Sequence, residues 1–177
     1  AEVKHNIKRM DRLLGNEQLY GQLESIYTAL VQFILGRART PVIVVDWTEL
    51  SFDGSYQLLR AAVPADGRAL SIYEEVHPRR NLNSPRVHRR FLRRLKTLLG
   101  ESCRPIVVTD AAFKTPWFKD VEKMGWNWVG RVRSLTMFQR CGEEVWLRCK
   151  SLHEKASCRS RYLGRVNLTR TNPLHCH

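Results

Sequence analysis

Two aspartates, Asp46 and Asp110, are the residues of this chain whose type and position best suit chemistry. Each stands at the C-terminal end of a β-branched apolar run, since Asp46 follows VIVV and Asp110 follows IVVT. Runs of this composition predict buried strands. An ionised carboxylate beside a core is costly unless it is paired or binds a cation. If the two strands are neighbours, both carboxylates face one gap that Mg²⁺ or Mn²⁺ can bridge, because these ions prefer hard oxygen ligands.

A pair of such ions activates water or a 3′-hydroxyl and stabilises the leaving oxygen in an in-line displacement at phosphorus. The reaction class that the two aspartates indicate is therefore phosphodiester cleavage and strand transfer. The alternative is that each Asp only ends its strand, as Asp often does at turns. The two residues taken together, in a basic chain, favour the metal site.

The charge of the chain indicates its partner. A formal net charge of +13 attracts polyanions by counterion release and long-range steering, so double-stranded DNA is the expected partner. No apolar run approaches the roughly 20 residues that span a bilayer. No signal-peptide pattern opens the chain. We therefore expect no membrane partner and a cytoplasmic protein.

The elements that must position the aspartates follow from hydrophobic periodicity. Helical spacing predicts helices at 4–15, 17–35, 84–99 and 116–124. Strands are predicted at 41–47, 56–63, 70–76, 105–110 and 126–134, the second and third joined by a turn at 64–67. Shorter strand candidates follow at 137–139, 145–147 and 163–168.

This order gives the expected fold class and domains. Three antiparallel strands, a helix, a strand, a helix and a strand are the order of an α/β ribonuclease-H-like core. We assign residues 1–40 to a helical lead-in, 41–134 to the core and 135–177 to the start of a basic, β-rich insertion.

Three strings add a family resemblance, namely KHNIKRMDRLLGN, PVIVVDWTEL and VVTDAAFKTPWFKDVEKMGWNWVGRVRS. They resemble the bacterial insertion-sequence DDE transposases with a Tyr-Arg-Glu-Lys signature, which include the transposases of composite resistance transposons. The resemblance covers essentially the whole chain. It implies that Asp46, followed by Trp47, is the first catalytic aspartate. It also implies that Asp110, in an Asp-x-x-Phe-Lys context with an aromatic pair behind it, is the second.

The sequence departs from the family pattern at the third acid. In the family this glutamate belongs to a Tyr-x-x-Arg-x-x-x-Glu motif beyond the inserted β-domain, and no such motif occurs before His177. We therefore expect the chain to stop inside the insertion and to be inactive alone. Nearby glutamates are interpreted as solvated surface charge: Glu49, Glu74, Glu75, Glu143 and Glu144.

DNA contacts are predicted from basic residues around the second aspartate, namely Lys114, Lys119, Arg131 and Arg133. Contacts of this type position the DNA backbone and do not read its sequence. The basic helix at 84–99 either follows phosphates or is a solvated face. By resemblance, the working complex is a homodimer that bridges two DNA ends. Two alternatives stay open, a ribonuclease-H-like nuclease or resolvase, and a non-catalytic DNA-binding remnant.

Overall fold

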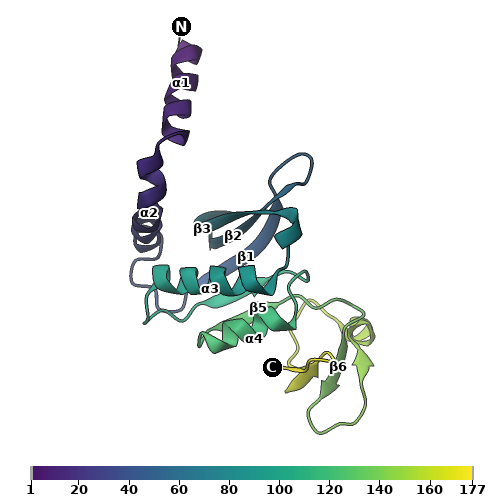
Figure 1. The fold of residues 1–177 in the computed structure, drawn as a ribbon. Helices are drawn as coiled ribbons and strands as arrows, with labels where there is room; N and C mark the ends of the chain where they lie inside the picture. The colour runs from purple at the N-terminus through teal and green to yellow at the C-terminus, as the bar shows by residue number, and fades with distance from the viewer. Residues whose placement is uncertain (1, 177) are drawn as a thin grey trace.

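The computed structural model describes residues 2–176. The chain begins with two helices, α1 (Glu2–Leu14) and α2 (Glu17–Leu35), and continues into two β-sheets (Figure 1). The helices of the remaining chain are α3 (Pro85–Leu99) and α4 (Thr115–Lys123), with short 3-10 turns η1 (Arg79–Asn81) and η2 (Cys149–Lys155).

The larger sheet contains both strands that end in aspartate. Its strand order is β3-β2-β1-β4-β5. Strand β2 is antiparallel to both of its neighbours, β1 and β3, whereas β4 and β5 run parallel to β1. This is the ribonuclease-H-like arrangement, so the predicted fold class is confirmed. The strands are β1 (Val42–Glu49), β2 (Tyr56–Ala65), β3 (Arg68–Pro78), β4 (Ile106–Thr109) and β5 (Asn127–Gly130).

The hairpin between β2 and β3 is tighter than predicted. Its turn consists of Asp66 and Gly67, with φ of 44° and 77°. Two central residues with positive φ match the right-handed twist of the strands, and Asp-Gly is a favoured pair there. The ladder therefore continues through Pro64 and Ala65, which the sequence had placed in the turn.

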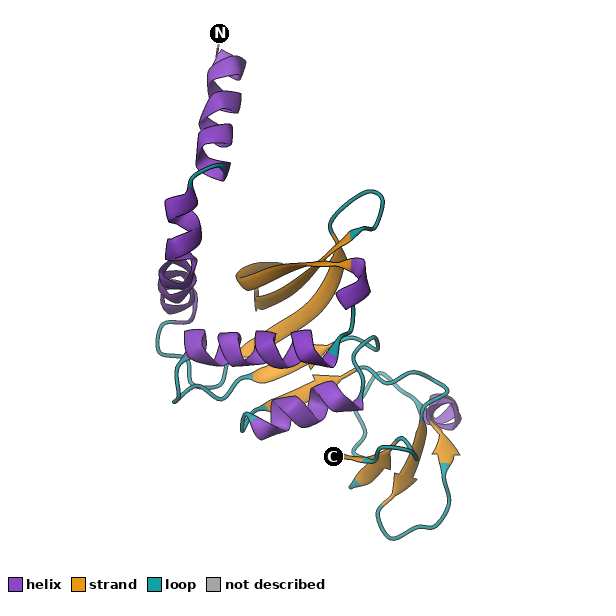
Figure 2. Cartoon of the chain, in the orientation of Figure 1, coloured by secondary structure: helices purple, strands orange, loops and turns teal. Residues whose placement is uncertain are grey.

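The helices form one layer on one face of this sheet. Figure 2 shows α3 and α4 side by side across it, and α2 packs against α3 and β3. Ile43 and Val45 of β1 point into this layer and are fully buried. On α3 the buried positions repeat at helical spacing, as predicted: Val87, His88, Phe91, Leu92, Leu95 and Leu98.

The opposite face of the sheet differs from the prediction. A continuous β-branched run predicts a strand covered on both faces, but burial along β1 alternates and Val42 is 39% exposed. Val76 and Val129, on β3 and β5, are exposed as well. The reason is that α2, α3 and α4 lie on the other face. Asp46 has the same parity as Val42 along β1, so it belongs to this open face.

The second sheet has the order β7-β6-β8-β9. The predicted strand at 137–139 is confirmed, and β8 covers the end of the predicted 163–168. The strand expected at 145–147 is shorter, because β7 begins at Leu147 and ends at Arg148, and β9 was not predicted. Leu174 of β9 is buried in the main core and attaches this sheet to it. The strands are β6 (Met137–Arg140), β7 (Leu147–Arg148), β8 (Val166–Leu168) and β9 (Leu174–Cys176).

Helix α1 extends away from the body of the molecule (Figure 1). Its apolar residues have helical spacing, as predicted, but Ile7, Met10 and Leu14 are each more than half exposed. Helix α2 is anchored by Val31, which is buried, and by Tyr27, whose ring meets Tyr73 edge-on. Within residues 2–176, no helix has the length and apolar content to cross a membrane.

Candidate metal-binding active site

Strand pairing brings Asp46 and Asp110 together. β1 and β4 are parallel neighbours with Val44 opposite Val108 and Val45 opposite Thr109. The next residue on each strand is an aspartate, and adjacent strands lie about 4.8 Å apart. Both aspartates are exposed. Asp110 directly follows β4, whereas Asp46 lies within β1, which continues to Glu49 instead of ending at the aspartate as the sequence predicts. The register therefore brings the two aspartates to neighbouring positions.

One oxygen of each carboxylate is held by the backbone. The Trp47 N–H donates to Asp46 Oδ1 at 2.8 Å, and the Ala112 N–H donates to Asp110 Oδ1 at 2.9 Å. Within the described residues, neither carboxylate forms an ion pair, and the second oxygen of each accepts no hydrogen bond from the protein. These oxygens are hard donors on one edge, so the residues present fit a divalent cation.

The electrostatics of the pair also favour a cation. Burial is the main cause that raises the pKa of Asp46, and the neighbouring negative charge of Asp110 raises it further. The hydrogen bond from Trp47 and the charge of Arg60 act in the opposite direction. Two carboxylates that repel each other across adjacent strands are stabilised by a positive ion between them.

Arg60 is a site residue that the sequence reasoning missed. It is the cross-strand partner of Asp46 on β2, and its Nε donates to Glu74 Oε1 at 2.7 Å. Only the antiparallel register places it beside the aspartate. The available signal was an arginine inside the apolar run LLRAAV, which is unusual for a strand interior.

Three of the four predicted DNA-binding residues gather near Asp110. Lys114 precedes α4 and Arg131 follows β5, while Arg133 donates from Nε to the Ala111 carbonyl at 3.1 Å. All three line a groove of about 370 Å³, together with Phe113, Phe118 and Trp128. Lys119 is not among the residues that line it, but its ammonium donates to Asn172 Oδ1, and Asn172 does line the groove.

The basic face of α3 is occupied by ion pairs within the protein. Arg90 forms an ion pair with Glu75, with 2.7 Å between Nη2 and Oε2, and Arg94 forms one with Glu24, with 2.6 Å between Nη1 and Oε2. Arg89 and Lys96 lie within 4 Å of Asp120 and Glu101. These contacts favour the interpretation of α3 as a solvated face of the helix layer.

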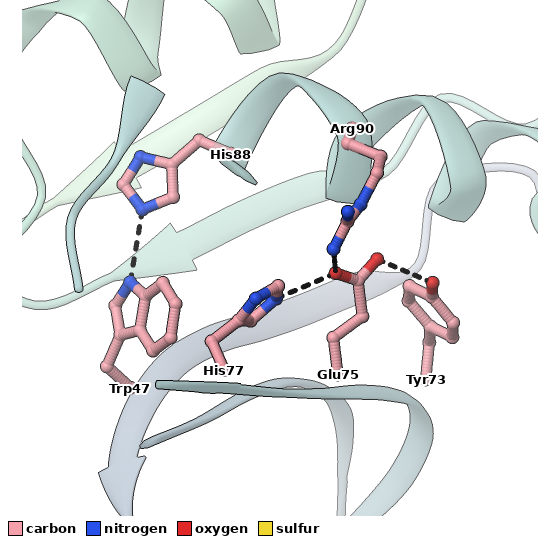
Figure 3. A network of polar contacts seen from close by, with 6 residues as sticks. All are labelled: Trp47, Tyr73, Glu75, His77, His88 and Arg90. Atoms are coloured by element: carbon pink, nitrogen blue, oxygen red, sulfur yellow. Dashed lines mark hydrogen bonds and ion pairs between the residues drawn. The ribbon is translucent and has the colours of Figure 1, made fainter. Parts of the chain in front are cut away.

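Glu75 corrects one interpretation from the sequence. It is not solvated surface charge, because its side chain is only 12% exposed. It accepts hydrogen bonds from Arg90 and Tyr73 and contacts His77 at 2.8 Å (Figure 3). Burial alone would raise its pKa, but the Arg90 and Tyr73 hydrogen bonds lower it. Glu75 therefore stabilises the packing of β3 against α3 and is not a candidate metal ligand.

A second buried histidine, His88 on α3, connects to the strand of Asp46. The indole N–H of Trp47 donates to His88 Nε2 at 3.0 Å (Figure 3). Burial, aided by the charge of His77, lowers the pKa of His88 from 6.5 to about 4. His88 is therefore neutral in the folded protein at neutral pH, with its proton on Nδ1.

We expect acid to destabilise the protein through His88. Between pH 6.5 and about 4 the unfolded chain protonates this ring and the folded chain does not, so stability present above pH 6.5 is lost as the pH falls. The expected loss is about 3 kcal/mol by pH 4. Urea unfolding of wild type and His88→Phe at pH 7 and pH 4 measures it. A stability difference between the two proteins that does not change with pH would contradict it.

Comparison with known proteins identifies a family. A sequence model of the family described as Transposase DDE domain matches residues 37–177. The matched residues include both aspartates and the whole of the larger sheet. No curated protein and no solved structure matches the chain.

Proposed function

Because this chain belongs to the transposase family that shares the DDE domain, we propose that Asp46 and Asp110 are two of its catalytic, metal-binding carboxylates. The reaction is metal-dependent phosphodiester hydrolysis and strand transfer at transposon ends. The observation that supports this proposal is the β1–β4 register, because Asp46 and Asp110 each directly follow the last residue pair of this ladder, Val45 and Thr109.

Asp46 and Asp110 would hold Mg²⁺ or Mn²⁺ through oxygens that the backbone leaves free. When bound, the metal supplies activation of a water or a 3′-hydroxyl and stabilisation of the leaving oxygen. The Trp47 and Ala112 amides orient the two carboxylates before any substrate arrives. Such prior orientation reduces the reorganisation needed during the reaction.

The basic residues beside Asp110 position the DNA. Lys114, Arg131 and Arg133 line the groove next to the aspartate, so a phosphate backbone that follows them passes the carboxylates. Arg133 also holds the Ala111 carbonyl, which fixes the loop that follows Asp110. Lys119, whose ammonium donates to Asn172 of this groove, is the fourth proposed contact to the DNA backbone.

Residues 1–177 alone are expected not to nick DNA. Within the described part of the chain, no third His, Cys, Asp or Glu joins the two aspartates in a group that could hold a metal. Two carboxylates hold a pair of ions less completely than three, so the in-line displacement lacks part of its charge stabilisation. The assay is conversion of supercoiled plasmid in Mg²⁺ or Mn²⁺. Magnesium-dependent nicking that Asp46→Ala abolishes would overturn this expectation.

DNA binding tests the rest of the proposal. Replacing Lys114 and Arg131 by alanine should weaken binding to duplex DNA and reduce the salt dependence, d log K/d log[salt], by about 1 to 2, because each phosphate contact contributes about 0.9. Fluorescence anisotropy at several salt concentrations measures both effects.

The matched control replaces Arg37 and Arg68 by alanine. Both residues are exposed and lie at the opposite end of the sheet, Arg37 before β1 and Arg68 at the start of β3. Their replacement removes the same amount of positive charge as the replacement of Lys114 and Arg131. An equal loss of affinity and slope in both double variants would show that net charge alone binds the DNA.

A further inference from the structure

The two aspartate segments contact the same buried side chain. Trp47 directly follows Asp46, and Phe113 lies three residues after Asp110. Both aromatic rings pack against His88, which comes from α3 and is 4% exposed. His88 is thus a physical connection between the two segments, in addition to the β1–β4 ladder.

The contacts of His88 differ on its two sides. On the β1 side its Nε2 accepts the Trp47 indole N–H at 3.0 Å. On the β4 side its ring stacks on Phe113, with centroids 5.3 Å apart and planes 26° apart. Trp117 of α4 meets the same ring edge-on at 5.0 Å. One residue therefore supplies a directional acceptor to one segment and a flat packing surface to the other.

This pair of contacts needs a particular residue type. A leucine packs but accepts no hydrogen bond, and a phenylalanine stacks but leaves the indole N–H without its partner. A neutral imidazole does both. Trp47 is also held from its other side by the ring of His77, 5.6 Å away, which Glu75 fixes in turn (Figure 3).

We propose that His88 is a positioning residue that holds the end of β1 and the loop after β4 in a fixed relation, and thereby holds the Asp46 and Asp110 carboxylates at one spacing. The connection to each carboxylate is short. The Trp47 amide holds Asp46 Oδ1, and the Ala112 amide, next to Phe113, holds Asp110 Oδ1. The consequence for metal binding rests on the proposed function.

The test uses His88→Phe, which keeps the stacking surface and removes the acceptor, and His88→Gln, whose amide oxygen can accept from the indole. Trp47→Phe removes the donor and guards against a folding defect specific to residue 88. Phe91→Leu, on the same helix and fully buried, is the control for a general loss of packing. Two quantities are measured: amide hydrogen exchange at Trp47 and Ala112 by NMR, and Mn²⁺ affinity of the 177-residue chain.

We expect His88→Phe and Trp47→Phe to raise exchange at both amides relative to the other core amides, and to weaken Mn²⁺ binding by about tenfold, the usual cost of losing a residue that orients a ligand. His88→Gln should recover most of both effects. Phe91→Leu should leave the relative exchange at the two amides and the Mn²⁺ affinity near wild type.

The proposal is overturned if His88→Phe loosens only the Trp47 amide, or if Phe91→Leu reproduces its effect. Asp46→Asn in the same binding assay reports on the proposed function alone. If Asp46→Asn binds Mn²⁺ as wild type does, the metal site is wrong, while the exchange data still decide whether His88 connects the two segments.

Discussion

Asp46→Asn and Asp110→Asn are each expected to weaken Mn²⁺ binding by about tenfold or more, because the charge count of oxygen ligands sets affinity for hard divalent ions. Each change removes one of the two carboxylate charges that the pairing of β1 with β4 brings to neighbouring positions. Isothermal titration or the electron paramagnetic resonance of free Mn²⁺ measures the affinity.

Asp46→Asn is also expected to fold as well as wild type. Burial and the neighbouring Asp110 raise the pKa of Asp46, which means that its charge is unfavourable in the folded protein. Replacing it by a neutral isostere at pH 7 therefore leaves the free energy of unfolding unchanged or slightly increased. A loss of metal affinity together with retained stability is the signature of a binding site, because removal of a structural residue would lower both.

Asp66→Asn is the matched control for this measurement. Asp66 is an exposed aspartate in the β2–β3 turn, and its φ of 44° is a conformation that Asn also adopts readily. It changes the net charge by the same amount at the opposite end of the sheet. If Asp66→Asn weakens Mn²⁺ binding as much as Asp46→Asn does, the ion is attracted by overall charge and the site is refuted.

Trp117→Ala is expected to destabilise the protein by about 3–5 kcal/mol, the usual cost of removing a buried large aromatic side chain. Trp117 is 1% exposed, and its ring centroid lies 4.7 Å from that of Phe113 and 5.0 Å from that of His88. Its loss leaves a cavity between α3, α4 and the loop after Asp110. Urea unfolding measures the change.

Trp117→Phe gives the sharper result. The Trp117 indole N–H is buried and has no hydrogen-bond partner among the described residues. Leaving such a donor unsatisfied costs about 1–3 kcal/mol, so its removal offsets part of the lost packing. Trp117→Phe should therefore cost much less than Trp117→Ala. Equal destabilisation by the two changes would indicate that the indole N–H has a partner.

Local patterns in the sequence determined the elements and their kinds. The β-branched runs before Asp46 and Asp110 became strands, and the apolar spacing of α3 produced its buried face. Pro85 at the first turn and Gly100 after the last, with φ of 80°, bound this helix. Such features depend on residues close together in the chain, so the chain order alone is enough to predict them.

The sequence also indicated the two aspartates, since each follows a β-branched apolar run, although β1 continues past Asp46 to Glu49. Their chemistry follows from residue type and from the order of elements, which makes β1 and β4 neighbours in a ribonuclease-H-like sheet. Several predictions of finer detail failed. The turn predicted at 64–67 is shorter, because the ladder continues through Pro64 and Ala65. The prediction that both faces of β1 are covered failed because it depended on which other elements pack against the strand.

Only the tertiary structure decided which side chains meet. Arg60 lies beside Asp46 because of the β1–β2 register. Glu75 is buried because Arg90 of α3 packs over the end of β3. His88 contacts both aspartate segments because α3 carries its ring to a place where it meets both Trp47 and Phe113. The register of strand pairing and the packing of a helix join residues far apart in the chain. Their free energies depend on the whole set of contacts, and no local pattern of residues encodes them.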